Sequence, residues 1–576
     1  MSQVLARTSV LIVGAGPTGL ALACDLRSRG IDVKVIDRAA APATTSRALG
    51  LHARGSEILA RLGALDDLAE RAIRGAAINI CVGERRLARI ETGGAPGGVT
   101  PGVLVIAQAE IESRLRARLA QLGREVIWGS EFLGIGSQGP KISATVRSDD
   151  GEALIKADWL VGCDGAHSRV RKLAGIAFDG NAFAERFILA DVQLDWQRPA
   201  NESVAWLHPD GVLAAIPLPG NIWRIMAELP ADEEIEGEQS GSPCQAAARD
   251  LLYRYFTERL GDTATRIGEM TWVSVFRFHR RLASTYRRGQ TLIAGDAAHI
   301  HSPFGGQGMN TGLGDAYNLG WKLAMVAQGR AADRLLDTYE AERRPVAADV
   351  LATTTTNTTL LLGNTLIHRL VRDFAFLPAM RLPAVRRKMA AKASQLNVGY
   401  ANGPLAIRTL ASRLACLARS KPVAGDRGAN ARCLILPGRK PTTLADETCA
   451  GWALLLFGAE AAASSECVAV ARSRLGKEVR VIRILPRDKA MTGRDPEGAD
   501  AVLQDHLGSI ADIYRPRRTE TVLLRPDGHM AWSAVRPKAA ELRQWLKMAL
   551  DHDHRTELNR HDEMRLVLPA GFKSPA

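Results

Sequence analysis

An unbroken apolar run near the start of the sequence, Val10 to Val13, predicts a strand buried in a parallel sheet. The glycine-rich segment Gly14–Gly19 follows, then a helical pattern to Arg29, then a second apolar strand at Val33–Ile36. Strand, turn, helix and strand in this order make a βαβ unit. This part of the chain is therefore expected to fold as a Rossmann-like α/β domain.

Later segments extend this pattern and then change it. A helix is predicted from Gln108 to Leu119, and strands followed by turns at Trp159–Cys163 and Thr291–Ala294. Between these strands the chain alternates apolar and polar residues over short runs, which predicts an inserted antiparallel sheet. The expected strands of this sheet are Val204–His208, Val212–Pro217, Ile222–Glu228 and Trp272–His279.

The C-terminal part begins with helical pattern and then returns to strands. A long helical region is expected from Gly312 to about residue 396, with interruptions at Pro345, Pro378 and Pro383. Beyond it, strands and helices alternate, in the order of a thioredoxin-like α/β domain. The elements expected there are Ala453–Phe457, Val479–Leu485, Thr521–Leu524, Met530–Ala534 and a helix over Lys538–Leu550.

At 576 residues the chain is too long for one hydrophobic core, so several domains are expected. We predict a discontinuous dinucleotide-binding domain, an inserted substrate domain with an antiparallel sheet, a helical linker, a thioredoxin-like domain and a charged tail. Their predicted ranges are 1–174 with 286–350, 175–285, 351–420, 421–551 and 552–576.

Composition narrows the possible partners. The formal net charge is +13, but the basic residues are spread along the chain and only 5% of residues are aromatic. This favours attraction of phosphate-bearing cofactors over nucleic-acid binding. The eight cysteines form no C-x-x-C pair or metal-ligand spacing, and no signal-peptide layout is visible, so we expect a cytoplasmic protein without a metal site.

The apolar stretch Leu360–Leu382 contains several charged residues, His368 and Arg372 among them. It is not expected to span a membrane. A packing helix pair is the favoured interpretation, and an amphipathic patch against a membrane surface stays open as the alternative. The sequence leaves a homodimer open.

The Gly14–Gly19 segment has the G-x-G-x-x-G spacing of a dinucleotide site. In this motif Gly14 permits a tight turn, Gly16 lets the backbone approach a pyrophosphate, and Gly19 lets helix and strand pack closely. The pyrophosphate is expected on the free N–H groups where the helix begins. Asp37, 21 residues after Gly16, is expected to bind the adenosine ribose.

Two further motifs follow in order, Asp164-Gly165 and Gly295-Asp296, and the unit that carries the second of them, residues 289–310, is the one that separates FAD from NAD. With them the chain resembles the class A flavoprotein monooxygenases, the family of 4-hydroxybenzoate and phenol hydroxylases. The resemblance covers residues 8 to 350. It is closest to the subgroup that hydroxylates phenols, phenylpropionates, polyketide aromatics and rifamycins, whose thioredoxin-like domain the segment Leu524–Trp532 also resembles.

The resemblance implies roles at the matching positions. Asp296 is expected to bind the ribityl chain, and Asp164 and Gly165 to lie near the pyrophosphate and take part in pyridine-nucleotide handling. Three more residues are assigned to the dinucleotide or its phosphates: Arg38, Arg47 and Gln108. The flavin is expected to be surrounded by Pro303 at its reactive edge and by Gly305, Gly306, Gly308, Met309 and Asn310 towards its pyrimidine end.

Elementary physics supports this placement of the flavin. A helix predicted from Gly312 directs the positive end of its dipole towards the part of the ring that becomes anionic on reduction. Glycines 305, 306 and 308 allow backbone N–H groups to approach the ring. No acid or base is assigned, because oxygen transfer depends more on a dry pocket than on a proton donor.

Aromatic and apolar residues of the inserted sheet are the candidates for binding substrate as a group: Trp206, His208, Trp223, Met226, Phe276 and Phe278. His299 and His301 are expected to pack or hydrogen-bond near the cofactor. His52 and Arg54 face the cofactor, the substrate entrance or solvent, and the sequence does not choose among these. Cys449 has no partner cysteine nearby, so the thioredoxin-like domain is expected to be structural or to serve oligomerisation.

The sequence therefore predicts a FAD-dependent monooxygenase that consumes NADPH or NADH and O₂. It is expected to hydroxylate a small aromatic substrate, phenolic or polyketide-like, through a flavin C4a-hydroperoxide. A Baeyer–Villiger-type insertion or another oxidative tailoring step on a polyketide is the alternative on the same scaffold. A FAD-binding regulatory protein without turnover is the alternative from another class.

Overall fold

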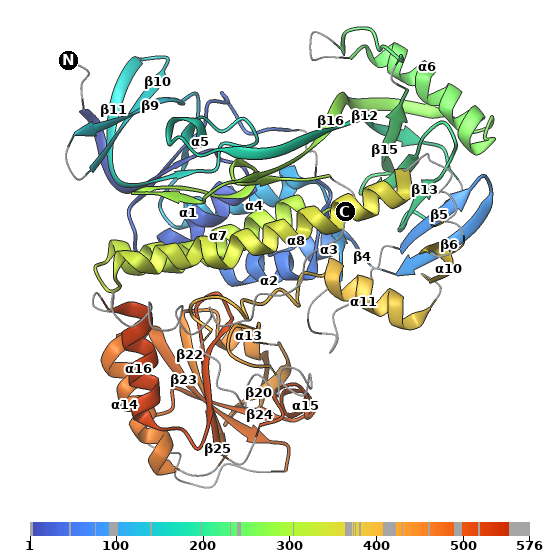
Figure 1. The fold of residues 1–576 in the computed structure, drawn as a ribbon. Helices are drawn as coiled ribbons and strands as arrows, with labels where there is room; N and C mark the ends of the chain where they lie inside the picture. Colours follow the sequence, from blue (N-terminus) through green and yellow to red (C-terminus); the bar gives the residue numbers. More distant parts are fainter. Residues whose placement is uncertain are drawn as a thin grey trace, which may run out of the picture.

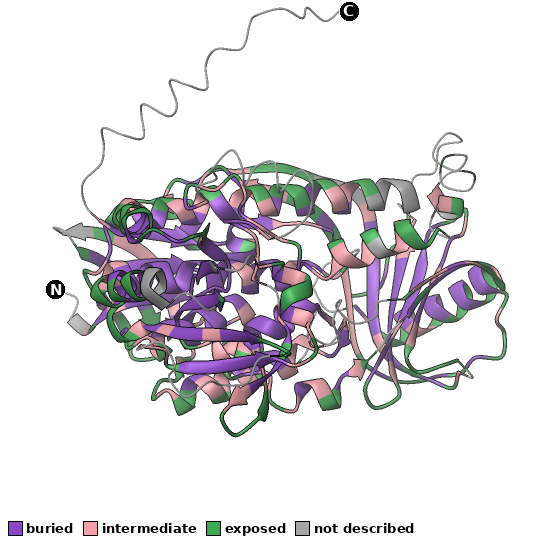
Figure 2. Ribbon diagram, turned by 90° about the horizontal axis from the view of Figure 1, so that it is seen from below, coloured by how far each residue is buried: buried purple, intermediate pink, exposed green. Residues whose placement is uncertain are grey.

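The computed structural model arranges the chain as two sheets above a layer of long helices and a third sheet below it (Figure 1). Buried residues gather along the sheet strands and the helices packed on them (Figure 2). The structure describes residues 4–44, 48–74, 77–91, 99, 102–138, 141–196, 198–230, 232–238, 243–302, 305–362, 371, 374, 376–379, 382–406, 422–428, 430–458, 461–488, 498–516 and 519–551.

The first sheet contains the expected βαβ unit. Strand β1 (Val4–Val13) pairs in parallel with β2 (Val33–Ile36) and with β11 (Gly151–Gly162), and α1 (Pro17–Ser28) connects β1 to β2. The order across the sheet is β17 (Arg287–Arg288), β18 (Thr291–Ile293), β11, β1, β2 and β8 (Val126–Ile127). Strands β9 (Glu131–Gln138) and β10 (Lys141–Ser148) extend it from β11. The sequence prediction of a parallel strand at residues 10–13 is confirmed, because these residues are 6% exposed or less.

The second sheet is antiparallel except for one pair of strands. Its order is β19 (His299–Ile300), β16 (Ile267–Ala283), β12 (Phe178–Leu194), β15 (Ile222–Leu229), β14 (Leu213–Leu218), β13 (Glu202–Trp206), β5 (Ala77–Val82) and β6 (Arg85–Glu91). Strands β12 and β16 extend from beside the first sheet into the second (Figure 1).

The predicted range of the inserted sheet, 175–285, is too narrow. Strands β5 and β6 come from residues 77–91, which were assigned to the dinucleotide-binding domain, and β5 pairs in parallel with β13. Such a pairing joins segments more than a hundred residues apart, so no local alternation of apolar and polar residues reveals it. The second sheet is therefore built from three separate parts of the chain, within residues 77–91, 178–283 and 299–300.

The helix layer begins earlier than the sequence predicts, and its first interruption follows Ala327 instead of falling at Pro345. Helix α7 (Gly308–Ala327) begins four residues before the expected Gly312, and α8 (Asp337–Leu362) passes through Pro345 without ending there. The neighbours Glu342 and Arg343 make buried ion pairs that hold this part of α8 in place. Tertiary contacts therefore override the local preference of proline to end a helix.

The third sheet mixes parallel and antiparallel pairs. Its order is β21 (Lys440–Thr443), β20 (Arg432–Leu436), β24 (Ala501–Asp505), β23 (Val479–Pro486), β22 (Trp452–Gly458), β25 (Thr519–Leu524) and β26 (Met530–Val535). The four predicted strands are present, and β20, β21 and β24 are additional. Helices α14 (Ala461–Leu475) and α16 (Ala539–Leu550) share one apolar cluster with Trp321 of α7, so this unit packs directly on the helix layer.

No helix within the described part of the chain is long and apolar enough to cross a membrane.

Candidate functional site

The glycine-rich turn after β1 is tightly packed at two of its three glycines. Gly14 has a φ of +106°, and a Cβ atom there would lie 2.3 Å from the carbonyl oxygen of Cys163. A Cβ on Gly19 would lie 2.0 Å from the carbonyl oxygen of Gly14. No side chain fits at either position, so both glycines serve the close packing of strand and helix.

Gly16 differs from both, because no atom of the described structure lies within 4 Å of the place where its Cβ would be. It is the N-cap of α1, its backbone is extended, and no side chain caps the helix. No acidic residue occupies the first turn. Open space in front of uncapped N–H groups at the positive end of a helix fits an anionic group such as a pyrophosphate.

Asp37 lies at the end of β2, beside this turn. Its Oδ2 accepts a hydrogen bond from the N–H of Ala15 at 2.7 Å, and its Oδ1 accepts one from Ala39 at 2.9 Å. The carboxylate is thus fixed beside the glycine-rich turn. Of the other predicted dinucleotide ligands, Arg38 is exposed and Arg47 lies outside the described residues. Gln108 begins α4 (Gln108–Gln121) and donates to Glu112 at 2.7 Å.

The second motif closes on the first through Cys163, whose carbonyl oxygen lies against Gly14. The Asp164 carboxylate accepts hydrogen bonds from Ser168 Oγ at 2.5 Å and from the N–H groups of Arg169 and Val170 at 2.7 and 3.1 Å. These contacts place it at the start of α5 (Arg169–Leu173). Asp164 therefore holds a short helix in place, a role that the sequence did not suggest, while Gly165 has a φ of +78° and open space at its Cβ position.

The third motif also meets the first. Gly295 has a φ of +64°, and a Cβ there would lie 2.5 Å from Thr18 Oγ1 in the first turn of α1. The next residue, Asp296, is exposed. The fold thus brings together three motifs that are far apart in the sequence.

The loop before α7 carries the predicted flavin contacts. Gly305 and Gly306 have φ values of +105° and +61°, which side chains rarely adopt. The Asn310 amide holds the loop, because its Nδ2 donates to the carbonyl oxygens of Gly306 at 2.9 Å and Gly50 at 2.8 Å. Its Oδ1 accepts from the backbone N–H of His52 at 2.8 Å.

Helix α7 begins directly after this loop. Gln307 is its N-cap without a side-chain hydrogen bond, and no acidic residue occupies the first turn. The positive end of a 20-residue helix is therefore open towards the loop. Gly308 is the first helical residue, and Met309 packs into the core of the first unit. Pro303, the residue expected at the reactive edge of the flavin, lies outside the described residues.

His52 and Arg54 are buried behind the loop, so the interpretation that they face solvent is wrong. The His52 ring lies against the backbone of Gly305 and Gly306, and its Nδ1 donates to the carbonyl oxygen of Ala393. Burial lowers the pKa of His52, which keeps the ring neutral. His52 thereby connects the loop to the end of α11 (Pro383–Ala393).

A buried carboxylate that the sequence analysis missed supports the same helix. Asp315 accepts hydrogen bonds from His299 Nε2 at 2.6 Å and from Arg343 Nε at 2.7 Å. Burial alone would raise its pKa, but His299 and Arg343 hold that pKa below its usual range. His299 thus hydrogen-bonds near the cofactor motif, as predicted, and burial lowers the pKa of His301 to about 4. A charged residue inside an otherwise apolar helix was the signal that could have revealed Asp315.

The six predicted substrate residues do not form one group, because they lie on opposite faces of the second sheet. Trp206 and Trp223 belong to the cluster that contains α6 (Gln245–Tyr255). His208 follows β13 beside Asp210, at the surface. The opposite face carries Met226, Phe276 and Phe278. Side chains alternate along a strand, so neighbours in sequence are separated by the sheet itself.

The face with Met226, Phe276 and Phe278 is the one connected to the loop before α7, residues 305–310, which we call the flavin loop. Met389 of α11 packs against it. One helical turn later, Ala393 accepts the hydrogen bond from His52. The apolar face and the glycine loop are thus joined through one helix, which makes this face the better candidate for a substrate pocket.

Comparisons with known proteins agree with this geometry. The family model described as FAD binding domain matches residues 7–354. The chain is 35% identical to the 6-methylpretetramide 4-monooxygenase of Streptomyces rimosus, over 91% of this chain and 90% of that one. It is 34% identical to a rifampicin monooxygenase of Rhodococcus hoagii, over 68% and 79% of the two chains.

A solved structure gives the same result. The anhydrotetracycline hydroxylase OxyS from Streptomyces rimosus superimposes with a TM-score of 0.73 at 27% identity. The superposition covers 94% of this chain and 99% of the other.

Proposed function

The chain belongs to the FAD binding domain family, and from this premise we propose that it is a FAD-dependent monooxygenase that hydroxylates a bulky, polyketide-like aromatic substrate. NADPH or NADH supplies the electrons, and O₂ supplies the oxygen atom. The observation that carries the proposal is the convergence of three motifs on the open space at Gly16 and on the glycine loop before α7. The proposed positions are the open space at Gly16 for the pyrophosphate, Asp37 for the ribose, and the glycine loop before α7 for the planar ring.

Bound FAD supplies the redox and oxygen chemistry, and the protein's own groups bind it and orient it. The N–H groups at the start of α1 hold the pyrophosphate, and Asp37 holds the ribose. Gly305 and Gly306 present backbone to the ring, with the positive end of α7 behind them, which favours negative charge on the reduced ring. The apolar face around Phe276 and Phe278 excludes water from the reacting atoms.

A polyketide-like aromatic is favoured as the substrate class for two reasons. The Streptomyces rimosus relative, of which the match covers 90%, acts by its name on 6-methylpretetramide. OxyS acts by its name on anhydrotetracycline. The proposed pocket face of this chain carries Met226, Phe276 and Phe278, which match a large flat apolar ligand.

For the C-terminal unit we infer a thioredoxin-like fold. Its central strands β22, β23 and β24 are parallel, its hairpin β25–β26 is antiparallel, and α14 and α16 share one apolar cluster with the sheet. Cys449 forms no disulfide among the described residues and has no second cysteine at C-x-x-C spacing, so a structural role is favoured over redox chemistry. The domain limits stay predictions, with residues 77–91 now assigned to the substrate unit. Cytoplasmic location and a homodimer also stay predictions.

Three observations on the purified protein test the function. The protein should be yellow, oxidise NADPH or NADH faster when a polycyclic phenol is added, and place one atom of ¹⁸O₂ on a ring carbon. Colourless protein that does not bind added FAD would overturn the proposal. Flavin-containing protein whose NAD(P)H oxidation no aromatic stimulates would favour the regulatory alternative, and an ester or lactone product would favour Baeyer–Villiger insertion.

A further inference from the structure

We propose that the hairpin turn of the C-terminal unit, Arg525–His529, is a positioning element for the flavin loop. The inference rests on the proposed placement of FAD at Gly305–Asn310. The turn connects β25 to β26. Most hairpin turns lie at the surface, but this one is buried. Arg525, Asp527 and His529 are each 2% exposed or less.

Hydrogen bonds within the turn hold its own conformation. Gly528 has a φ of +81°, and its N–H donates to the carbonyl oxygen of Arg525 at 2.9 Å. Asp527 Oδ1 accepts hydrogen bonds from Arg525 Nε and from the N–H of His529, both at 3.1 Å. The backbone of the turn therefore presents fixed acceptors to its surroundings.

The first connection leads to α7. The carbonyl oxygen of Pro526 accepts a hydrogen bond from Tyr317 Oη at 3.0 Å. Asp527 Oδ2 accepts from Asn318 Nδ2 at 3.4 Å and from Trp321 Nε1 at 3.3 Å. Tyr317 lies two helical turns after Asn310, the residue that holds the flavin loop. The turn thus fixes how far α7 can slide or rotate beneath the loop.

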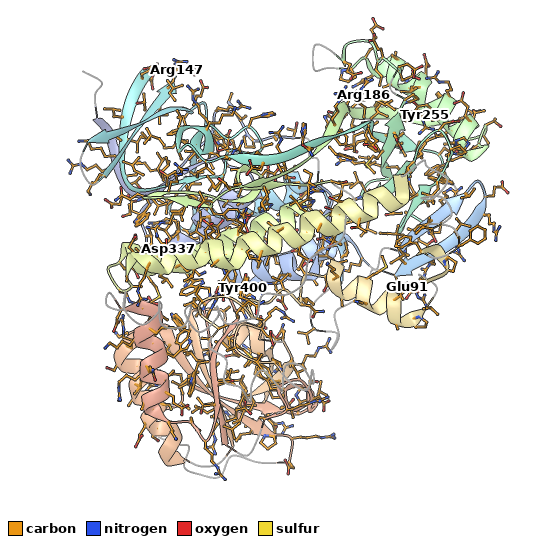
Figure 3. All side chains as sticks on the ribbon, viewed as in Figure 1. Glu91, Arg147, Arg186, Tyr255, Asp337 and Tyr400 are labelled. Atoms are coloured by element: carbon orange, nitrogen blue, oxygen red, sulfur yellow. The ribbon has the colours of Figure 1, made fainter. Side chains whose placement is uncertain are left out.

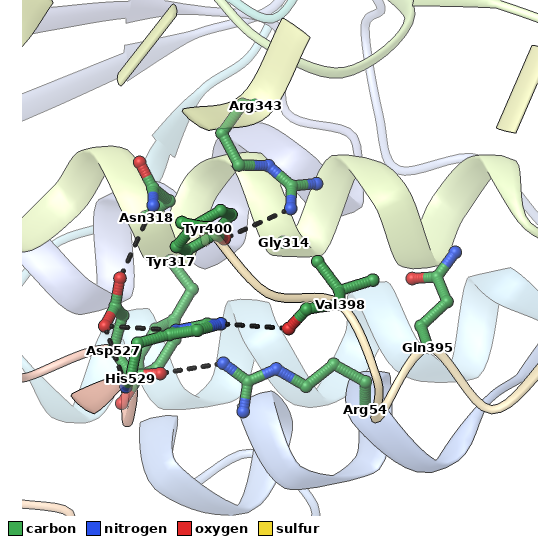
Figure 4. Close-up of a pocket in the computed structure, with 10 residues that line it drawn as sticks. All are labelled: Arg54, Gly314, Tyr317, Asn318, Arg343, Gln395, Val398, Tyr400, Asp527 and His529. Carbon is green, nitrogen blue, oxygen red and sulfur yellow. Dashed lines mark hydrogen bonds and ion pairs between the residues drawn. The ribbon is translucent and has the colours of Figure 1, made fainter. Parts of the chain in front are cut away.

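The second connection leads to α2 (Ala53–Leu62). Arg54 Nη2 donates to the carbonyl oxygen of Asp527 at 2.7 Å, as Figure 4 shows. Arg54 is in the first turn of α2, two residues after His52, whose N–H donates to Asn310. Both connections therefore lead to Asn310. The first runs through α7, which contains Asn310, and the second runs through α2 and His52.

A buried charge cluster fixes the turn to the helix layer. Arg525 donates to Glu342 at 2.6 and 2.9 Å, and Glu342 also accepts from Lys322 Nζ at 2.8 Å. Tyr400 lies at the boundary between the helices and the C-terminal unit (Figure 3), and its Oη accepts a hydrogen bond from Arg343 at 3.3 Å. An ion cluster of this kind resists small displacements, because any shift leaves a buried charge without its partner.

These contacts could serve stability alone, and that alternative predicts different measurements. If the turn only holds two units together, weakening it lowers the unfolding temperature and leaves the flavin unchanged. If the turn positions the loop, weakening it changes FAD affinity and the reduction potential of the bound flavin, because the N–H groups and the positive end of α7 move relative to the ring.

The deciding variant is Tyr317→Phe, which removes the hydroxyl that contacts Pro526 and the Arg61 side chain. Its control is Tyr253→Phe on α6, where the lost hydroxyl hydrogen-bonds to the backbone of Ile267 in β16. We expect FAD to dissociate from Tyr317→Phe with a constant about tenfold higher, or ~1.4 kcal/mol. We also expect a more negative flavin potential and a lower yield of product per NAD(P)H consumed.

Asp527→Asn, with Asp512→Asn on exposed α15 (Ser509–Tyr514) as its control, should show the same changes more strongly. If Asp527→Asn does not fold, Tyr317→Phe decides by itself. FAD affinity and potential in Tyr317→Phe equal to those in Tyr253→Phe would overturn the positioning role.

Gly16→Ala separates this failure from a failure of the proposed cofactor site. If Gly16→Ala weakens FAD binding and Tyr317→Phe does not, only the positioning role is overturned. If neither variant affects FAD, its proposed placement is overturned as well.

Discussion

Asn310 Oδ1 accepts a hydrogen bond from the backbone N–H of His52 at 2.8 Å, and so joins the start of α7 to a segment 258 residues earlier in the chain. The same amide donates to the carbonyl oxygens of Gly50 and Gly306. The side chain is fully buried. One amide therefore satisfies three backbone groups and sets the distance between the flavin loop and α2.

Replacing this amide tests its importance. In Asn310→Ala one buried and two part-buried backbone groups lose a partner, and an unsatisfied buried group costs about 1–3 kcal/mol. We expect FAD affinity to fall by about tenfold or more. Fluorescence titration with FAD measures it. Asn201→Ala, at an exposed position before β13, is the control, and equal affinities in the two variants would contradict the prediction.

Two glycines of the first motif should respond in opposite ways to the same change. Gly19→Ala places a methyl group against the carbonyl oxygen of Gly14, so the protein without FAD should lose stability. Gly16→Ala meets no described protein atom, so its stability should stay within about 0.5 kcal/mol while FAD binding weakens. Thermal unfolding of the FAD-free proteins and FAD titration give the two values. A stable Gly16→Ala variant with normal FAD affinity would show that this space is not the pyrophosphate site.

The buried carboxylate of Glu342 should make the protein sensitive to acid. Burial by itself would raise its pKa, but Arg525 and Lys322 lower it from 4.5 to about 2. Because the folded state has the lower pKa, this stabilisation is complete above pH 4.5 and is lost as the pH falls towards 2.

Glu342→Gln should therefore flatten the dependence of unfolding free energy on pH between 4.5 and 2. It should also lower stability at pH 7 by about 3–5 kcal/mol, because the buried Lys322 loses its charged partner and Arg525 is left with Asp527. Urea unfolding over this pH range measures both effects. Asp349→Asn, exposed on the same helix, should change neither, and an unchanged acid slope in Glu342→Gln would refute the assignment.

The two faces of the second sheet should differ in their effect on catalysis. Phe276→Ala removes a ring from the face joined to the flavin loop, so we expect kcat/KM to fall about tenfold and the substrate preference to change. Phe256→Ala, on the α6 face, should lower stability by about 3–5 kcal/mol and leave substrate preference unchanged. Steady-state kinetics with two aromatic substrates and thermal unfolding distinguish the outcomes. A change of preference in Phe256→Ala alone would place the pocket on the other face.

Some structural features depend on short segments of the chain and could be predicted. The βαβ unit at residues 10–37 depends on an apolar strand, a turn that only glycine fits and a helix directly after it. The hairpin before and after Pro526 depends on a turn between two apolar strands. In both cases the interacting residues are neighbours in sequence, so their pattern contains the information.

Other features could not be predicted from local patterns, because they depend on contacts between segments that are distant in the sequence. Strands β5 and β6 joined a sheet whose other strands begin at residue 178, because their partner β13 is distant in the chain. Met226 and Trp223 were expected in one pocket, and the alternation of the strand put them on opposite faces. The charges of Lys322 and Glu342 inside buried helices were visible, but not that a turn in the C-terminal unit would pair with them.

The sequence by itself therefore determined a dinucleotide site, because the glycines and the acidic residue that bind a dinucleotide follow fixed local spacings. The choice of FAD and the class of reaction came from the resemblance of three ordered motifs to one family of flavoproteins. The tertiary structure alone decided which residues support that site. The contacts of Asn310 with His52, and of Asp527 with Arg54 and Trp321, join segments that come together only when the whole chain is packed. Hydrogen bonds between distant segments follow from the packing of sheets and helices, which no short spacing encodes.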